Sequence, residues 1–291
     1  MTAASTTATA ATATGAARDR LAERFAKLKA ENRGGLVIYT MAGDPDARTA
    51  LEIMKGLPAA GADVIELGMP FSDPMADGPA IQAAALRALK AGMTLQGTLD
   101  TLAAFREGDD ETPVVLMGYY NPIYAYGPQR FAEAARAAGC DGLIIVDLPP
   151  EEAPELNEHL DRVGIHLIFL TTPTTNEKRL PAVLKEAGGF LYYVSITGIT
   201  GAASAVEDEV AQAVAGIRAH TDLPIAVGFG IRTPEQAAAF ARIGDAAVVG
   251  SAVVAQITDS LSAEGAAGPD TVARPLALVR DLAAGVRTAR Q

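Results

Sequence analysis

The chain contains 291 residues, of which 49% are hydrophobic and 20% are charged, so it can bury a core and differs from disordered chains. Its formal net charge of −11 disfavours a general nucleic-acid or anionic-membrane binder, because such proteins bind through clustered Lys and Arg. The single cysteine excludes an intrachain disulfide and fits a reducing compartment, and no apolar run approaches the length of a membrane span. We therefore expect a cytoplasmic protein with no nucleic-acid or membrane partner.

The N-terminal 17 residues form a low-complexity tract of Ala and Thr. This tract lacks the basic start and the apolar stretch of a secretory signal. We expect residues 1–17 to be a disordered extension and residues 18–291 to form one catalytic domain. The domain begins with a predicted amphipathic helix over 18–30, in which Leu21, Phe25 and Leu28 share one face.

Eight short apolar runs follow, and each is followed by a segment with helical spacing. Nearly continuous apolar runs are typical of parallel strands that are covered on both faces. Eight strand–helix units predict an α/β fold, a single (β/α)8 TIM barrel, with a doubly wound open sheet as the alternative. No G-x-G-x-x-G fingerprint follows a strand, which disfavours the open sheet. The runs are 36–40, 63–67, 113–117, 142–146, 165–170, 189–194, 224–227 and 246–249.

Two segments depart from the plain repeat. The stretch 79–107 is long enough for two helices and is interrupted near Gly92, so we expect an extra helix there. Residues 260–269 are predicted to be a surface insertion before a last helix over 272–288.

The second run places a carboxylate toward the barrel interior. Side chains alternate along a strand, so Val64, Glu66 and Gly68 should face inward while Ile65 and Leu67 face the helices. Burial disfavours the ionised carboxylate and raises its pKa, which suits a general acid/base. A structural Glu paired with a buried donor is the alternative for Glu66.

The loop after this run, residues 69–79, is stiffened by three Pro and carries two further acids. Asp77 can reach over the end of the barrel toward which Glu66 points. Two carboxylates in different surroundings can hold opposite protonation states. Asp-Pro and Asp-Gly pairs are also common in turns. We assign Asp73 to the turn and leave Asp77 open between the two roles.

Three later loops predict an anion site. Residues 195–204 are rich in Gly, Thr and Ser, and glycine-containing turns follow the seventh and eighth runs at 228–233 and 250–252. The loops after strands 7 and 8, with the N-terminus of a short helix, form the common phosphate site of TIM barrels. The pattern therefore favours a phosphorylated substrate.

Further residues of the later strands and loops are candidates for the pocket wall. Tyr192 has the parity of the inward positions of its strand, but a core aromatic explains it slightly better. Further candidates for the pocket wall are Tyr119, Asn121, Tyr126 and Asp147, the last of which could equally anchor a loop. The three His residues are not spaced as metal ligands, so we expect no metal. A metal-free acid/base pair beside a phosphate cradle fits aldol-type cleavage or isomerisation of a sugar phosphate.

The segment DVIELGMPFSDPMADGPAI, residues 63–81, resembles the signature of the tryptophan synthase alpha chain family. Supporting segments are YTMAGDP at 39–45, LMGYYNP at 116–122, IVDLP at 145–149, YYVSITGITG at 192–201 and VGFGIRTP at 227–234. The resemblance extends over about residues 20–290 and leaves out only the N-terminal tract.

This resemblance implies a carbon–carbon lyase that cleaves indole-3-glycerol phosphate to indole and glyceraldehyde 3-phosphate in the last stage of L-tryptophan biosynthesis. It assigns the general acid/base to Glu66, the contact with the indole N–H to Asp77 and substrate placement to Tyr192. It implies that the phosphate ligands are Gly201, Gly230, Gly250 and Ser251, and that the pocket is lined by Tyr39, Met117, Thr200 and Phe229. Some relatives carry an Arg where this chain has Ile196, so a lid contact made by that Arg is not expected here.

The resemblance also implies a partner, a tryptophan synthase beta chain in an αββα heterotetramer. Pyridoxal phosphate belongs to that beta chain, so no cofactor is assigned to this chain. The loop after the second strand and the region of the third strand would face the partner.

Three other functions stay open on sequence. One is a sugar-phosphate isomerase or epimerase, which would share the phosphate cradle but does not need the 63–81 segment in this form. The second is a non-catalytic activator of a beta chain, which the presence of Glu66 and Asp77 disfavours. The third is a free-standing indole-releasing lyase, which sequence separates poorly from a subunit.

Overall fold

The computed structural model describes residues 18–195, 203–228 and 230–290, and the predicted extension over 1–17 lies outside them. Its strands are β1 Gly35–Met41, β2 Val64–Gly68, β3 Val114–Gly118, β4 Gly142–Ile145, β5 His166–Leu167, β6 Phe169–Thr171, β7 Leu191–Val194, β8 Ile225–Gly228 and β9 Ala246–Val249. Its helices are α1 Arg20–Ala30, α2 Ala47–Ala60, α3 Pro79–Lys90, α4 Leu95–Arg106, α5 Tyr120–Tyr126, α6 Pro128–Ala138, α7 Pro154–Val163, α8 Leu180–Glu186, α9 Ala203–Arg218, α10 Pro234–Ile243, α11 Ser251–Thr258 and α12 Ala273–Thr288.

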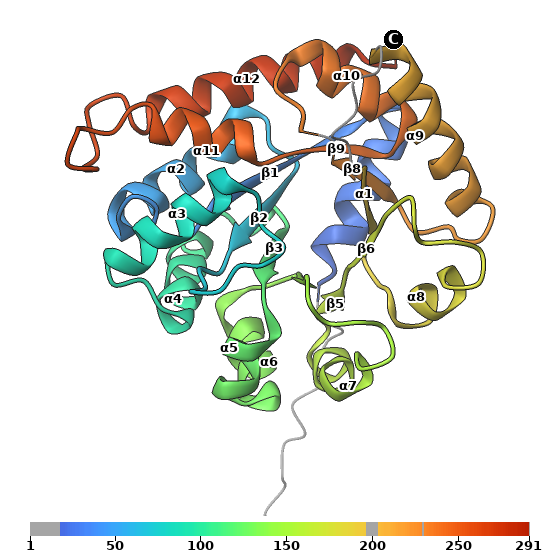
Figure 1. The fold of residues 1–291 in the computed structure, drawn as a ribbon, viewed down its shortest axis with the longest axis horizontal. Helices are drawn as coiled ribbons and strands as arrows, with labels where there is room; N and C mark the ends of the chain where they lie inside the picture. The colour runs from blue at the N-terminus through green and yellow to red at the C-terminus, as the bar shows by residue number, and fades with distance from the viewer. Residues whose placement is uncertain (1–17, 196–202, 229, 291) are drawn as a thin grey trace, which may run out of the picture.

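The strands form one parallel sheet that curves into a barrel, with helices around it (Figure 1). The strand order is β5-β4-β3-β2-β1-β9-β8-β7-β6, so its two ends are the consecutive segments β5 and β6. The covalent backbone between β5 and β6 therefore joins the two ends of the sheet and completes the ring. The predicted TIM barrel is confirmed, and the doubly wound alternative is wrong.

The fifth predicted strand differs from expectation, because the run 165–170 forms two short strands in place of one. His166 and Leu167 pair with β4, and the Ile168 N–H still donates to the Leu143 carbonyl at 2.8 Å. From Phe169 onward the chain pairs with β7 instead. The run therefore changes its pairing partner at Ile168, and for this reason it forms two strands, β5 and β6.

Helix positions follow the sequence signals closely. The first helix starts at Arg20 and not at residue 18, because the Asp19 carboxylate accepts the Ala22 N–H at 2.9 Å and caps the helix. The stretch 79–107 forms α3 and α4, as predicted. The last helix, α12, begins at Ala273, one residue after its predicted start.

The core has two layers separated by the sheet. Inward side chains of the strands, such as Val64 and Val115, form the inner layer, and Leu21, Phe25 and Leu28 of α1 pack against it. Ile65 and Leu67 lie in the outer layer, between sheet and helices. The alternation predicted for β2 is confirmed, and α1 covers one end of the barrel interior.

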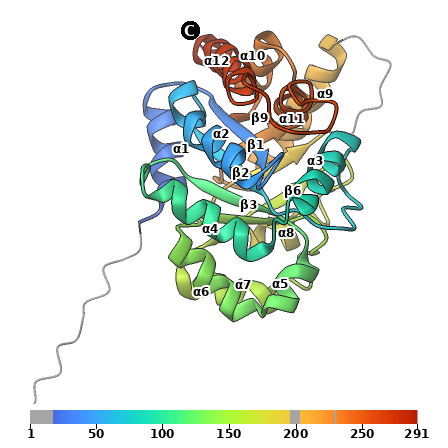
Figure 2. The same cartoon turned by 90° about the vertical axis from the view of Figure 1, so that its left-hand side faces the viewer.

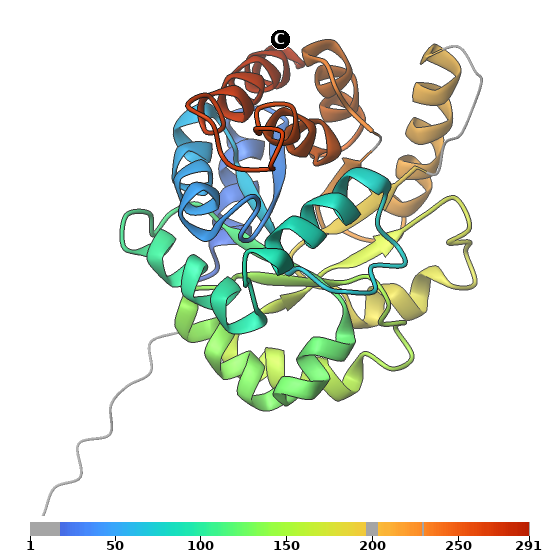
Figure 3. The same ribbon diagram turned by 60° about the vertical axis from the view of Figure 1, so that its left-hand side comes forward.

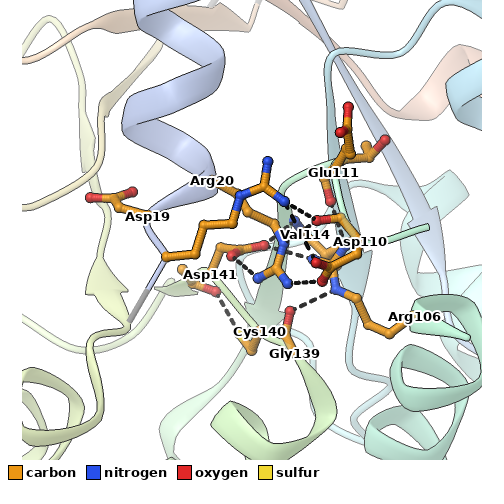
Figure 4. Close-up of polar contacts among 12 residues, drawn as sticks. Asp19, Arg20, Arg106, Asp110, Glu111, Val114, Gly139, Cys140 and Asp141 are labelled. Atoms are coloured by element: carbon orange, nitrogen blue, oxygen red, sulfur yellow. Dashed lines mark hydrogen bonds and ion pairs between the residues drawn. The ribbon is translucent and has the colours of Figure 1, made fainter. Parts of the chain in front are cut away.

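A buried ion cluster lies beside α1 at this covered end (Figure 4). Asp141, which is 3% exposed, accepts hydrogen bonds from Arg20 at 3.0 Å, from Arg106 at 2.7 Å and from the Val114 N–H at 2.9 Å. Arg20 also pairs with Asp110. These contacts join α1, α4 and the starts of two strands.

α3 lies at the end of the barrel opposite to the one that α1 covers (Figure 2). We call the end with α3 the mouth. α3 packs against α11 and β1, and the two helices lie side by side over the sheet (Figure 3). The carboxyl ends of the strands open at the mouth, where TIM-barrel active sites form. No helix in the described part of the chain combines the length and the apolar character needed to cross a membrane.

Candidate active site

Glu66 lies in the middle of β2 and faces the barrel interior. It is 1% exposed, and its Oε1 has no hydrogen-bond partner among the described residues. Burial raises the pKa of this carboxyl from 4.5 to about 8, because the ionised form loses its hydration. No donor among the described residues pairs with this oxygen, which disfavours a fully paired structural Glu, and the raised pKa favours the protonated carboxyl.

Asp77 lies in the loop that follows β2, just before α3. Its N–H donates to the Pro74 carbonyl at 3.0 Å, and its own carbonyl accepts from Gln82 of α3 at 2.9 Å. The Tyr119 hydroxyl accepts the Ala76 N–H at 3.0 Å and so connects this loop to the end of β3. Burial raises the pKa of the Asp77 carboxyl, and the Tyr119 hydroxyl opposes that rise.

Both acids face one cavity of 190 Å³ at the mouth. Its wall combines the ends of several strands with the start of α3 and of α11. The lining residues are Tyr39, Glu66, Asp77, Ile81, Met117, Tyr192, Val194, Ser195, Gly228, Gly230, Ile231, Val248, Gly250 and Ser251. Two carboxyl groups thus share a half-open pocket in different surroundings, which is an arrangement suited to proton transfer.

Two tyrosines extend over glycines of the neighbouring strand. A Cβ atom on Gly68 would lie 2.2 Å from the Tyr39 hydroxyl, and a Cβ on Gly228 would lie 2.4 Å from the Tyr192 hydroxyl. Only glycine leaves room for a ring at such positions. Burial raises the pKa of both phenols well above 10, and the negative charge of Glu66 contributes to both rises.

One end of the cavity lies at the start of α11. Gly250 precedes this helix and Ser251 is its first residue, and both line the cavity, so the first turn of α11 is the kind of site that can bind an anion. Gly230, from the turn after β8, lies in the left-handed region at φ 63°. Three uncharged residues can therefore offer donors to a phosphate.

Of the sequence-predicted site residues, the structure brings eight together at this cavity. They are Glu66, Asp77, Tyr39, Met117, Tyr192, Gly230, Gly250 and Ser251. Thr200, Gly201 and Phe229 lie outside the described residues. Tyr192 reaches the cavity and also packs on the inner core layer, so both interpretations of it hold in part.

The other candidates for the pocket wall do not line this cavity. Tyr126 of α5 donates to Gln96 of α4 at 2.7 Å, and Asp147 accepts the Tyr120 N–H at the start of α5 at 2.8 Å, so the two side chains hold α5 in place. The Tyr119 hydroxyl accepts the Ala76 N–H in the loop that carries Asp77, and Asn121 is exposed on α5.

Two lining residues, Val248 and Ile81, were not singled out from sequence. Val248 lies near the carboxyl end of β9, and strand alternation could have identified it. Ile81 lies on α3, one turn beyond Asp77, and only the position of that helix over the mouth reveals its role. Within the described ranges 18–195, 203–228 and 230–290, no cluster of three His, Cys, Asp or Glu side chains could hold a metal ion.

Comparison with known proteins gives a consistent result. The sequence model of a family described as "Tryptophan synthase alpha chain" matches residues 25–284. The tryptophan synthase alpha chain of Gluconacetobacter diazotrophicus is 58% identical over 271 residues, which cover 93% of this chain and 99% of that protein. The alpha chain of Caulobacter sp. strain K31 is 59% identical over 273 residues, with 94% and 98% covered.

Solved structures agree with these relatives. The tryptophan synthase subunit alpha of Legionella pneumophila superposes with a TM-score of 0.84 at 39% identity, covering 93% of this chain and 99% of that one. A chain of tryptophan synthase from M. tuberculosis, in an open form with BRD0059 bound, gives 0.82 at 34% identity, covering 93% and 99%.

The family determines the reaction class, and it excludes the sugar-phosphate isomerase alternative. Alpha chains are lyases of tryptophan biosynthesis that cleave indole-3-glycerol phosphate without a cofactor of their own, while pyridoxal phosphate resides in the beta chain. The match covers the whole barrel, with its phosphate turns and both acids. This chain belongs to the tryptophan synthase alpha chain family.

Proposed function

We propose that Glu66 is the general acid/base of the cleavage of indole-3-glycerol phosphate, and that Asp77 stabilises the positive charge that develops on the indole. The observation that carries this proposal is the 1% exposed carboxyl of Glu66, which faces the same cavity as Asp77 and whose Oε1 has no partner among the described residues. A buried polar atom without a partner is costly to the fold, so its retention at a cavity favours a role toward a ligand.

The proposed reaction begins with a proton transfer from Glu66 to the indole ring carbon that bears the glycerol chain. The ring becomes an indoleninium cation, and the Asp77 carboxylate accepts a hydrogen bond from its N–H. Glu66, now ionised, takes the proton of the adjacent glycerol hydroxyl. The carbon–carbon bond breaks, its electron pair restores the indole, and the hydroxyl carbon becomes the aldehyde of glyceraldehyde 3-phosphate. Glu66 ends protonated, as it began.

A pKa of about 8 supports the first step, because a carboxyl with this value is mainly protonated at neutral pH. An ordinary Glu would be ionised there and would have no proton to give. The same carboxylate is also a stronger base once it has lost its proton. One group can therefore serve both steps.

The remaining cavity residues hold the substrate in this proposal. Tyr192, Tyr39 and Met117 contact the indole, while Gly230, Gly250 and Ser251 hold the phosphate. Thr200, Gly201 and Phe229 are proposed for the same pocket on the family resemblance alone. Binding of the remote phosphate aligns the scissile bond with the two acids.

The first test is indole release from indole-3-glycerol phosphate by the purified chain, with and without a tryptophan synthase beta chain. Slow release that rises with the beta chain supports an alpha subunit. Fast release without any response supports a free-standing lyase, and no release under either condition, with a beta chain whose own activity rises, supports a non-catalytic activator. In the same assay Asp77→Asn should lose most activity, by about 10²-fold or more.

We also propose that the chain assembles with a beta chain into an αββα heterotetramer through the face formed by the Asp77 loop and α5. Two exposed apolar side chains support this face: Met75 is 80% exposed and Tyr124 is 60% exposed. Large exposed apolar groups are a common mark of an interface. Met75→Asp should weaken co-elution with the beta chain, whereas Ala266→Asp, in the exposed insertion, should not.

We further propose that residues 18–291 form one catalytic domain and that the protein acts in the cytoplasm. A phosphorylated metabolite as substrate and a single free cysteine support that location. Removal of residues 1–17 should leave indole release within about twofold of the full chain, because α1 is capped by Asp19 and needs nothing before it. Cell fractionation tests the location.

A further inference from the structure

A second buried acid at the mouth, Asp44, takes no part in the proposed chemistry. It lies in the loop after β1 and is 0% exposed. Arg87, in the last turn of α3, donates to it through Nε at 2.7 Å and through Nη2 at 2.9 Å. Such a bidentate pair fixes both distance and orientation.

Arg87 also reaches a third element. Its Nη2 donates to the Thr258 hydroxyl at 3.0 Å, and Thr258 is the last residue of α11. One guanidinium therefore connects the loop after β1, the end of α3 and the end of α11. The opposite ends of α3 and α11 reach the cavity, which is lined by Ile81 of α3 and Ser251 of α11.

The start of α3 determines where Asp77 lies. The helix begins at Pro79, only two residues after Asp77. Gln82, in its first turn, holds the Asp77 carbonyl at 2.9 Å. A rotation or shift of α3 therefore moves the Asp77 backbone with it. The start of α11, at Ser251, contributes the phosphate end of the same cavity.

We propose that Asp44 and Arg87 are a positioning pair for the cleavage reaction, because by joining the loop after β1 to α3 and α11 they fix the Asp77 carboxylate relative to the phosphate cradle. Neither residue lines the cavity, so neither touches the substrate. This inference rests on the proposed function of Asp77. Small misplacements of a catalytic group lower the rate strongly, so the pair should act on turnover.

The chain contains a matched control at the other end of the barrel. Arg33 donates to Asp63 through two nitrogens at 2.8 and 2.9 Å. The side-chain exposures are 19% and 5% for this pair, and 20% and 0% for Arg87 and Asp44. Loss of Arg33 leaves Asp63 with Arg24 at 3.5 Å and the Leu36 N–H at 2.9 Å, whereas loss of Arg87 leaves Asp44 without a cation among the described residues. Both losses should therefore destabilise the fold, and the loss of Arg87 should do so more. Only the loss of Arg87 should alter the active site.

The experiment is a double-mutant cycle on the full chain, with indole release measured for Arg87→Met alone, for Asp77→Asn alone and for both together. If Arg87 acts through Asp77, Arg87→Met lowers kcat about tenfold in the wild-type background and less than about twofold in the Asp77→Asn background. Arg33→Met changes kcat less than about twofold in both backgrounds. Arg87→Lys, which keeps the charge, recovers part of the loss. Inhibition by inorganic phosphate should weaken about threefold in Arg87→Met and stay unchanged in Arg33→Met.

Equal fold losses in the two backgrounds would overturn the inference, as would a loss in Arg33→Met that matches Arg87→Met. If Arg87→Met does not purify as a folded protein, Arg87→Lys replaces it in the cycle and the same criteria apply. The proposed function fails separately: it fails if the wild-type chain releases no indole or if Asp77→Asn keeps wild-type activity.

Discussion

Two buried acids at opposite ends of the same barrel have contrasting surroundings. Asp141, at the covered end, accepts from two arginines and from the Val114 N–H (Figure 4). Glu66, toward the mouth, has an oxygen without any partner among the described residues. The two side chains are buried to nearly the same degree, 3% and 1% exposed. Burial alone therefore does not separate a structural acid from a catalytic one.

The difference lies in how the charge is compensated. Burial raises the pKa of Asp141, but Arg106 and Arg20 oppose the rise, so its ionised form is stabilised by fixed partners. For Glu66, burial acts without such an opposing cation, and the pKa reaches about 8. A satisfied acid joins elements of the fold, whereas an unsatisfied one keeps a proton that it can give to a ligand.

The largest expected effect comes from Glu66→Gln, which keeps the shape of the side chain and removes its proton chemistry. We expect kcat for indole release to fall by about 10²–10⁴-fold. The far-ultraviolet circular dichroism and the thermal transition should show a folded protein. Near-normal turnover in this variant would contradict the proposed mechanism.

Asp141→Asn should produce the opposite result, a large effect on stability and a small one on chemistry. The neutral amide leaves Arg20 and Arg106 without their buried countercharge, which should lower the free energy of unfolding by about 3–5 kcal/mol. Urea denaturation measures this loss. At a temperature where the variant stays folded, kcat should lie within about threefold of wild type. A loss of activity without a loss of stability would make the two ends of the barrel functionally alike.

The pH dependence of stability should distinguish the acids further. Between pH 4.5 and about 8 the unfolded chain releases the Glu66 proton while the folded chain keeps it. The unfolded state thus binds fewer protons, and wild-type stability falls as pH rises through this window. Glu66→Gln lacks this penalty, so it should be more stable than wild type by up to roughly 3 kcal/mol at pH 7.

This stability gap should disappear near pH 4, where Glu66 is protonated in both states. Denaturant unfolding of both proteins at pH 4, 5.5, 7 and 8 tests the trend. A gap that is constant across these pH values would show that Glu66 is ionised in the folded chain. It would also remove the support that the raised pKa gives to the first proton transfer.

The sequence predicted much of this comparison, and its misses have physical reasons. Strand alternation placed Glu66 inside the barrel, and burial implied the direction of its pKa shift, because both follow from local spacing. It could not show that Asp141 is fully paired, since Arg20 and Arg106 lie 121 and 35 residues away in the chain. Nor could it show the split at Ile168, because the apolar pattern continues without interruption while the backbone changes partners.

The smallest predicted effect lies at the phosphate end of the mouth, away from both acids. Ser251→Ala removes one hydroxyl from the first turn of α11 and leaves the backbone donors in place. A hydrogen bond of this kind contributes about 1 kcal/mol, so KM for indole-3-glycerol phosphate should rise about fivefold. The control Ser262→Ala, in the exposed insertion, should change nothing. In the proposed binding mode the phosphate keeps its position while the carbon–carbon bond breaks, so its contacts should bind ground state and transition state equally, and kcat should stay near wild type. A fall in kcat instead would mean that Ser251 also helps to set the alignment of the scissile bond with Glu66.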